Sequence, residues 1–316
     1  MSDILVVGSV ALDSVKTTAG KSVEALGGSA TYFALSASYF TTVALVGVVG
    51  EDFPSEHRGT LERRGVDLAG LKAAKGKTFR WAGSYGKDAA VAKTLATDLN
   101  VFKTFKPVLS EAQRKMPVVF LANIDPELQS EVLSQMKGPA LVACDTMNYW
   151  IDSKPGAIKK LLSKVDVFFS NDQEAMKLTG APNALQAAEK IAELGPTVVV
   201  IKKGEHGAFM KVGSKFYVFP AFPLARIKDP TGAGDTFAGG FLGYLASTGA
   251  FKDISELKRA MAYGTTMASF NVEDFSTKNI EALEREAIDE RFHDFAERMT
   301  VPRAEAVIKG WRAVPA

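Results

Sequence analysis

KDPTGAGDTFAGGFLGYLAS, residues 228–247, is the stretch of sequence that decides the fold. Glycine inside a helix costs about 1 kcal/mol relative to alanine, yet glycines crowd a stretch that otherwise has helical periodicity. Phe237, Phe241 and Leu245 recur every fourth residue and share one helical face. Pro230 fixes a turn just before them. The stretch predicts a helix that buries one face and begins, at Gly232, on nearly bare backbone.

The first turn of this predicted helix consists of Gly232, Ala233, Gly234 and Asp235. Backbone N–H groups of a first turn lack partners inside the helix, and the helix dipole places about half a positive charge beside them. Because small residues let an anion approach those groups, the turn predicts an anion hole. Asp235 would repel the anion unless it acts on a third group, which fits a base that takes a proton from a hydroxyl. The dipole is expected to lower the pKa of Asp235.

A base of low pKa is sufficient in phosphoryl transfer, where positioning and charge stabilisation do most of the catalysis. The alternative is a glycine-rich turn in which Asp235 only stabilises the first turn of the helix.

Composition excludes several classes of protein. The 316 residues are 47% hydrophobic and 23% charged, as in an ordinary soluble protein, and a net charge of +2 gives no basic surface for nucleic acid. A single cysteine, Cys144, excludes an intramolecular disulfide, and with three histidines it argues against structural zinc. No apolar run approaches the roughly 20 residues that span a membrane, and the N-terminus lacks the basic segment of a signal peptide. We therefore expect a cytoplasmic protein without nucleic-acid or membrane partners.

Strands and helices alternate along the chain. Short apolar runs rich in Val, Ile and Phe are typical of buried parallel strands, and they lie at Ile4–Gly8, Val43–Gly50, Val118–Asn123, Ala140–Asp145, Val165–Asn171 and Thr197–Gly204. Helical stretches separate them, at residues 29–40, 54–65, 127–136, 184–194 and 254–270. This alternation predicts one α/β domain over residues 1–316, a doubly wound, largely parallel sheet with helices on both faces.

Two segments interrupt the alternation, at about residues 10–26 and 76–105. They have the short, Thr-rich and aromatic character of amphipathic strands, which predicts a small β-layer beside the main sheet. Within it, Phe79 and Trp81 fall on one face of a strand. The alternative is a pair of hairpins that pack these aromatic side chains into the core.

Other phosphate-binding motifs are absent. GLKAAKGKT has five residues between Gly70 and Gly76, one more than a Walker A loop allows, and is interpreted as a turn. The first strand is followed by GSVALDS, which lacks the glycine pattern of a dinucleotide-binding fold.

The run DPTGAGDTFAGGF resembles the C-terminal signature of the ribokinase-like kinases of sugars and nucleosides, the carbohydrate and purine kinase family. An Asp after strand one and a Gly-Gly pair that opens a helix, here Asp13 and Gly27-Gly28, are similar to the family's N-terminal pattern. The resemblance implies that Asp235 is the catalytic base and that the Gly232-Ala233-Gly234 backbone is the anion hole. It also implies that Asp13 binds substrate hydroxyls, that the glycine pair admits a sugar ring, and that the small β-layer is a lid.

The resemblance extends to the nucleotide side and implies ATP and Mg²⁺. Asn171-Asp172-Gln173-Glu174 matches the family's Asn-x-x-Glu motif, in which Glu174 would act on magnesium indirectly and Asn171 would help to place phosphate. VIKKGEHGAF resembles the segment that lines the nucleotide, with Lys203, Gly204 and Gly207 in place, and residues 262–276 occupy the position of the adenine pocket.

A monovalent cation such as K⁺ is a further implication of the resemblance. Asp229 and Thr231 stand beside the anion-hole loop, where family members bind the cation, and Thr231 would also contact the nucleotide. The alternative is a plain Asp-Pro-Thr turn.

The acceptor is open between two classes. Many carbohydrate kinases of the family carry asparagine where this chain has Tyr32, and DTMNYW, residues 145–150, departs from their usual segment. The breadth of the family favours a small sugar with a primary hydroxyl, contacted by Asp13 and Asn123. The alternative is a nucleoside phosphorylated at its ribose 5′-hydroxyl, with Tyr32, Phe79 and Trp81 around the base.

Two further expectations concern inactivity and assembly. A silent sugar- or nucleotide-binding regulator would be favoured by loss of Asp235 or of the glycines, and all of these are present. Lids often expose an apolar face, so lid pairing would give a homodimer. No function is assigned to the tail from about residue 300.

Overall fold

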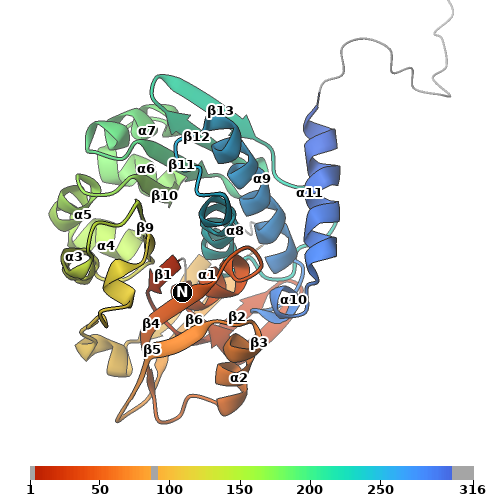
Figure 1. The fold of residues 1–316 in the computed structure, drawn as a ribbon. Coiled ribbons are helices and arrows are strands. Elements are labelled where there is room, and N and C mark those ends of the chain that lie inside the picture. The colour runs from red at the N-terminus through yellow and green to blue at the C-terminus, as the bar shows by residue number, and fades with distance from the viewer. Residues whose placement is uncertain (1–3, 87–91, 301–316) are drawn as a thin grey trace, which may run out of the picture.

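The computed structural model describes residues 4–86 and 92–300. Its main sheet has nine strands in the order β13-β12-β11-β10-β9-β8-β1-β4-β5 (Figure 1). The strands are β1 (Ile4–Val7), β4 (Val43–Gly50), β5 (Asp67–Ala74), β8 (Val118–Leu121), β9 (Leu141–Asp145), β10 (Val167–Asn171), β11 (Val198–Lys202), β12 (Ala208–Val212) and β13 (Lys215–Phe219). All neighbouring strands from β11 to β5 pair in parallel. Strand β12 pairs antiparallel with both β11 and β13. The predicted, largely parallel sheet is confirmed.

Helices cover both faces of this sheet. They are α1 (Ser29–Ala37), α2 (Ser55–Arg63), α3 (Pro126–Gln135), α4 (Asn148–Ser153), α5 (Pro155–Leu162), α6 (Asp172–Thr179), α7 (Ala184–Glu193), α8 (Ala233–Thr248), α9 (Ile254–Asn271), α10 (Lys278–Glu281) and α11 (Arg285–Met299). Helices α3 to α7 lie on one side in Figure 1, and α1, α8 and α9 on the other.

The alternation of side chains along β1 shows how one strand serves both faces. Ile4 and Val6 belong to the core under α1, α8 and α9, whereas Leu5 and Val7 belong to the core under α3, α5 and α7. Successive strand residues point to opposite faces, so a strand buried on both sides must be apolar throughout. This is the doubly wound arrangement that the sequence predicts.

The strands that the sequence did not predict are β5, β12 and β13. Strand β5 has the sequence DLAGLKAA, with Ala, Gly and Lys where strands favour β-branched residues, and it partly overlaps the stretch interpreted as a turn. Its edge position and its pairing with β4 override that weak preference. The β12–β13 hairpin extends the other edge of the sheet.

The glycines inside α8 are explained by the closeness of its neighbours. A Cβ atom on Gly239 would lie 2.5 Å from the carbonyl oxygen of Phe33 in α1, and one on Gly243 would lie 2.9 Å from the Cα atom of Ala37. On another side of α8, a Cβ atom on Gly240 would lie 2.9 Å from the carbonyl oxygen of Tyr263 in α9. Backbones therefore pack directly on α8, which offsets the low helix propensity of glycine.

A second sheet forms from the two interrupting segments. It has four strands in the order β3-β2-β6-β7, namely β2 (Ala11–Thr17), β3 (Gly20–Gly27), β6 (Phe79–Tyr85) and β7 (Ala92–Asp98). Two antiparallel hairpins, β2–β3 and β6–β7, are joined through parallel pairing of β2 with β6. The small β-layer is confirmed, except that its last residues form the short 3-10 helix η1 (Asn100–Thr104).

Two other short 3-10 helices occur, η2 (Gln113–Lys115) and η3 (Gly204–His206). Within residues 4–86 and 92–300, no helix is long and apolar enough to cross a membrane. The C-terminal tail from residue 301 lies outside the described residues.

Candidate active site

At the start of α8, the backbone N–H groups of Gly232, Gly234 and Asp235 make no hydrogen bond to another backbone group among the described residues. Gly232 precedes α8 with φ 74°, a left-handed conformation natural to glycine. The N–H of Ala233 donates to the carbonyl of Pro230 at 3.2 Å, and that of Thr236 donates to Gly232 at 2.8 Å. No such bond is made by the N–H groups of Gly232 and Gly234. Their position at the positive end of α8 supports the predicted anion hole.

A lysine that the sequence analysis missed lies against this turn. Lys202 is the last residue of β11, and its Nζ atom lies 2.7 Å from where a Cβ atom on Gly234 would be. The neighbouring Lys203, predicted to contact the nucleotide, immediately precedes η3, and its backbone N–H donates to the carbonyl of Gly207 at 2.7 Å. The carboxyl end of a parallel strand is where α/β folds bind ligands, and this rule could have selected Lys202.

The pKa of Asp235 is raised from 3.8 to about 7, because the surrounding protein desolvates its carboxyl group. Lys202 opposes this shift, and the carboxyl of Glu174 adds to it. The expectation that the helix dipole would lower this pKa is therefore wrong, because burial outweighs the dipole. A carboxyl with a pKa near 7 is a stronger base than the sequence predicts.

Buried polar atoms without partners mark the carboxyl ends of three adjacent strands. Among the described residues, Oδ1 of Asn123, Oδ1 of Asp145 and Oγ of Ser170 have no hydrogen bond, and they follow or end β8, β9 and β10. Asn123 donates through Nδ2 to the sulfur of Met147 at 3.0 Å. Buried polar atoms are rarely left unpaired, so these atoms point to a ligand site at this edge of the sheet.

Asp145 was not predicted as a site residue. Burial raises the pKa of its carboxyl well above the usual value, the carboxyl of Asp235 raises it further, and Lys202 lowers it. Asp145 therefore lies in the same electrostatic neighbourhood as Asp235.

Asp13 is held by the glycine pair Gly27-Gly28, a contact that the sequence analysis did not predict. Its Oδ2 accepts a hydrogen bond from the N–H of Gly28 at 3.3 Å, and a Cβ atom on Gly27 would lie 2.0 Å from the same oxygen. Burial raises the pKa of Asp13 to about 7, and the carboxyls of Asp229 and Asp235 add to this shift. The structure thus brings Asp13 and Asp235, far apart in the sequence, into one site.

Two of the predicted aromatic residues pack against protein. Tyr32 is only 2% exposed, and its ring lies 2.4 Å from where a Cβ atom on Gly232 would be. Tyr32 therefore packs against the anion-hole loop. Phe79 stacks on Phe102 with ring centroids 5.3 Å apart. These contacts favour a packing role for both side chains.

Trp81 has a different environment. It pairs with Asp13 in the parallel register of β2 and β6, so both side chains leave the small sheet on the same face. The indole is half-buried and covers Gly83, where a Cβ atom would lie 2.1 Å from the ring. Two residues after Gly83, the hydroxyl of Tyr85 accepts a hydrogen bond from Oγ1 of Thr231 at 3.3 Å, which connects this face to the anion-hole loop.

Asn171 and Glu174 form a capping box at the start of α6. Oδ1 of Asn171 accepts from the N–H of Glu174 at 2.7 Å, and Oε2 of Glu174 accepts from the N–H of Asn171 at 2.9 Å. No cluster of three or more metal-ligating side chains occurs in the described part of the chain. One carboxylate beside a phosphate site fits Mg²⁺, which is usually held by one or two carboxylates and substrate phosphates.

The predicted nucleotide segment forms the turn between β11 and β12. Gly204 opens η3 with φ 55°, and Gly207 has φ 83° with its Cα facing β13, where a Cβ atom would lie 2.1 Å from the carbonyl oxygen of Phe219. Both positions require glycine for backbone reasons. Their contact with a nucleotide stays a prediction.

Asp229 and Thr231 hold the loop before α8. Asp229 is 1% exposed, and its two oxygens accept from the N–H groups of Thr231 at 2.9 Å and Ser276 at 3.1 Å. The carbonyl of Thr231 accepts from Nδ2 of Asn271 at 2.8 Å. These bonds support the turn interpretation, and the monovalent cation stays a prediction.

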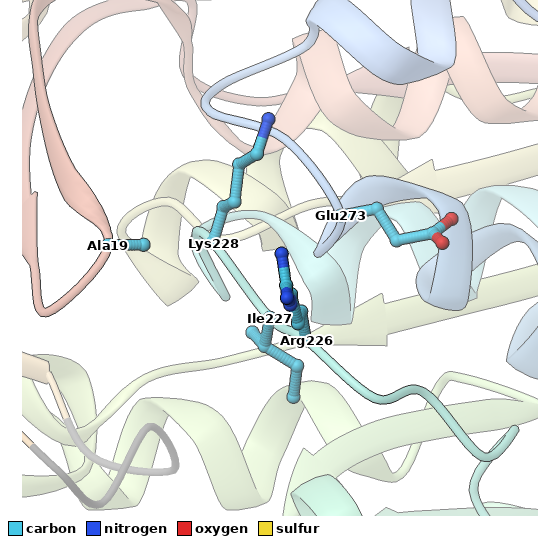
Figure 2. Close-up of a pocket in the computed structure, with 5 residues that line it drawn as sticks. All are labelled: Ala19, Arg226, Ile227, Lys228 and Glu273. Atoms are coloured by element: carbon cyan, nitrogen blue, oxygen red, sulfur yellow. The ribbon is translucent and has the colours of Figure 1, made fainter.

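A separate cavity of about 520 Å³ lies beyond this loop (Figure 2). It is lined by Ala19, Arg226, Ile227, Lys228 and Glu273. Glu273 and Lys228 are engaged in ion pairs with Arg291 and Asp274, at 2.7 and 3.1 Å. The cavity includes none of the predicted site residues.

Comparisons with known proteins show which family the chain belongs to. Residues 1–283 match the family model described as pfkB family carbohydrate kinase. A cytidine kinase of Thermococcus kodakarensis is 33% identical over 248 residues, which cover 77% of this chain and 88% of the relative. The crystal structure of a nucleoside kinase from Methanocaldococcus jannaschii superimposes with a TM-score of 0.75 at 20% identity, covering 93% of this chain and 99% of that one.

A putative ribokinase II from E. coli, solved in complex with ATP and Mg²⁺, gives a TM-score of 0.77 at 15% identity, with 93% and 100% of the two chains covered. The chain belongs to the pfkB family of carbohydrate kinases. It is a phosphotransferase with an alcohol group as acceptor, from the group of sugar and nucleoside kinases that use ATP.

Proposed function

We propose that this chain transfers the γ-phosphoryl group of ATP to the 5′-hydroxyl of a nucleoside, with Asp235 as the catalytic base. The observation that carries the proposal is the position of Asp235 in the first turn of α8, beside the unbonded N–H groups of Gly232 and Gly234 and with a pKa of about 7. Such a carboxylate accepts a hydroxyl proton near neutral pH, next to backbone donors that can hold phosphate.

The residues divide the reaction between them. Asp13 would bind ribose hydroxyls at the glycine pair Gly27-Gly28 and orient the acceptor. As the acceptor oxygen bonds to the γ-phosphorus, its proton passes to Asp235, and the bond from that phosphorus to the bridging oxygen of ADP breaks. Magnesium, when bound to the nucleotide phosphates, would neutralise their charge, and Glu174 would bind it through water.

The nucleoside is favoured over a free sugar by Trp81. Its half-buried indole shares one face of the small sheet with Asp13, where it can cover a base while Asp13 binds the ribose. A relative that matches over 88% of its own length is named cytidine kinase. A free sugar is the second candidate, because the family model describes carbohydrate kinases and an indole also stacks on a sugar ring.

The deciding experiment is ADP release from Mg-ATP across ribose, fructose, other hexoses, adenosine, cytidine, inosine and guanosine. Turnover with nucleosides alone is expected. For Trp81→Ala, the KM for the nucleoside should rise at least about tenfold, as expected for loss of a base stack of 1–3 kcal/mol, while the KM for ATP stays unchanged. Turnover with free sugars alone would reject the nucleoside assignment, and silence across the panel would reject it as well and point to an acceptor outside the panel.

The cation proposal has a separate test. Replacing sodium by potassium at constant ionic strength should raise turnover if Asp229 helps to bind the cation. Equal rates in the two salts would remove this proposal and leave Asp229 as a loop anchor.

A further inference from the structure

Lys202 is a cation surrounded by acidic groups from three elements. Its positive charge acts to lower the pKa values of three carboxyls, those of Asp145 in β9, Glu174 in α6 and Asp235 in α8. Burial raises the same pKa values by more. No carboxylate oxygen among residues 4–86 and 92–300 lies within 4.0 Å of its ammonium group. Lys202 is therefore near three carboxyls without being paired to one.

The ammonium group lies at an electrostatically unusual place. Its Nζ atom occupies the space beside Gly234 that a side chain would fill, at the positive end of α8. A cation in this position is repelled by the helix dipole, and the N–H groups of Gly232 and Gly234 beside it have no acceptor. One anion bound between the ammonium and the turn would satisfy all three groups.

The number of donors at this place favours a phosphoryl group as the bound anion. Two N–H donors and one ammonium group converge on the first turn of α8, next to the carboxyl of Asp235. A phosphoryl group has several oxygens that can accept from separate donors, whereas a carboxylate has two.

We propose that the Lys202 ammonium group binds an oxygen of the γ-phosphoryl group while that group is transferred. This inference rests on the proposed kinase function and adds a catalytic residue to it. The charge of its ammonium group balances the negative charge that spreads over the phosphoryl oxygens and the leaving ADP. It also offsets the repulsion between those oxygens and the carboxylate of Asp235.

A purely structural role would have a different signature. If Lys202 only separated the three carboxyls, its loss would lower stability and shift the pH profile but would affect ATP and ADP binding alike. A contact with the γ-phosphoryl group makes ATP binding more sensitive than ADP binding, because only ATP carries that group.

The test compares Lys202→Met with Lys202→Arg and with the control Lys211→Met. Lys211 lies on the neighbouring strand β12, where its Nζ donates to the carbonyl of Gly213 at 2.6 Å, outside the site. Calorimetry would measure Mg-ATP and Mg-ADP binding without acceptor, and ADP release would give kcat and KM. Thermal unfolding would show that each variant folds.

For Lys202→Met we expect kcat to fall at least about 10²-fold, the range seen when one donor to transition-state charge is removed. ATP affinity should fall more than ADP affinity, Lys202→Arg should recover part of kcat, and Lys211→Met should match the wild type. A kcat within threefold of the wild type, or equal losses of ATP and ADP affinity, would overturn the proposal.

If Lys202→Met does not fold, the ATP-to-ADP affinity ratio of Lys202→Arg decides, because an unchanged ratio would overturn the proposal. A wild type that binds ATP but phosphorylates no nucleoside would reject the nucleoside assignment, while the affinity comparison still tests Lys202.

Discussion

Asp235 shows how the surroundings of one residue change its chemistry. In the sequence it is an aspartate at a helix start, where the dipole favours the ionised form. In the structure, desolvation and the carboxyl of Glu174 outweigh both the dipole and Lys202, and its pKa rises to about 7. The ionised base is therefore present above this pH and lost as the pH falls below it.

This residue makes a prediction about rate and pH. Asp235→Asn should lower kcat by about 10²–10⁴-fold with little change in the KM for ATP, because only proton transfer is removed. In the wild type, kcat should fall about tenfold per pH unit below pH 7, as Asp235 becomes protonated. ADP release measured from pH 5 to 9 checks both statements.

A matched control is Asp294→Asn, which removes an exposed carboxylate paired with Arg298 at 2.8 Å on α11. It should leave kcat unchanged. Equal turnover by wild type and Asp235→Asn would contradict the assigned base, and a flat profile between pH 5 and 8 would contradict its raised pKa.

At the scale of elements, α8 joins the site to the core. Its first turn serves the anion hole, while its later glycines let α1 and α9 approach its backbone. The same helix therefore fixes Asp235 through contacts a full turn or more away from it. Rigid placement of a first turn by a packed helix is what precise phosphoryl transfer requires.

Gly239→Ala tests this packing. Its new methyl group would meet the backbone of Phe33, which cannot move without displacing α1, so the free energy of unfolding should fall by about 1–3 kcal/mol. Gly156→Ala in α5 is the control, because nothing lies within 4 Å of the added methyl group, and it should be neutral or stabilising. Urea unfolding of both variants checks the difference. A stabilised Gly239→Ala would show that helix propensity outweighs the close packing.

Elements with a strong pattern could be predicted, and features set by neighbours could not. The first four residues of VVVIK are apolar and β-branched, so its strand was predictable, whereas DLAGLKAA becomes β5 only because β4 offers it an edge. Whether Lys202 or Lys203 lies at the site depends on which residue ends β11. The sequence does not define that boundary to within one residue. The anion hole and Asp13 could be placed from a resemblance, but the orphaned oxygen of Asp145 appears only once the strands are aligned.

At the scale of the whole molecule, the small sheet leaves apolar side chains uncovered. All seven residues of its edge strand β7 are exposed, and Leu95 on β7 and Val23 on β3 are 58% and 68% exposed. A strand without burial is marginal in water, so a partner surface would stabilise it. We predict a homodimer formed through these sheets.

Sedimentation velocity checks the homodimer. Wild type should sediment as a dimer, and Leu95→Lys should shift it to the monomer because the charge would be buried between subunits. Val218→Lys is the control, since Val218 is 75% exposed on β13, in the main sheet. A monomeric wild type, or a dimer unaffected by Leu95→Lys, would reject assembly through the small sheet.

The free energy of unfolding should also depend on pH, because carboxyl groups are buried at the site. The pKa of Asp13 is raised from 3.8 to about 7 on folding, so the folded state binds more protons than the unfolded state between these values. The free energy of unfolding therefore falls as the pH rises from about 4 to about 7, and the loss is complete above pH 7. At about 1.36 kcal/mol per pKa unit, the loss at pH 8 is on the order of 4 kcal/mol.

Asp13→Asn removes this titration and keeps an oxygen that can accept from the N–H of Gly28. The variant should therefore be more stable than the wild type, with a larger gain at pH 8 than at pH 5, while its acceptor KM rises because a charged hydroxyl-binding group is lost. Urea unfolding at both pH values, with binding of the acceptor measured alongside, checks this pairing of gained stability and lost function. A gain that is the same at pH 5 and pH 8 would show that the carboxyl of Asp13 does not titrate between them, and a loss of stability at pH 8 would show that its charge is satisfied by the fold.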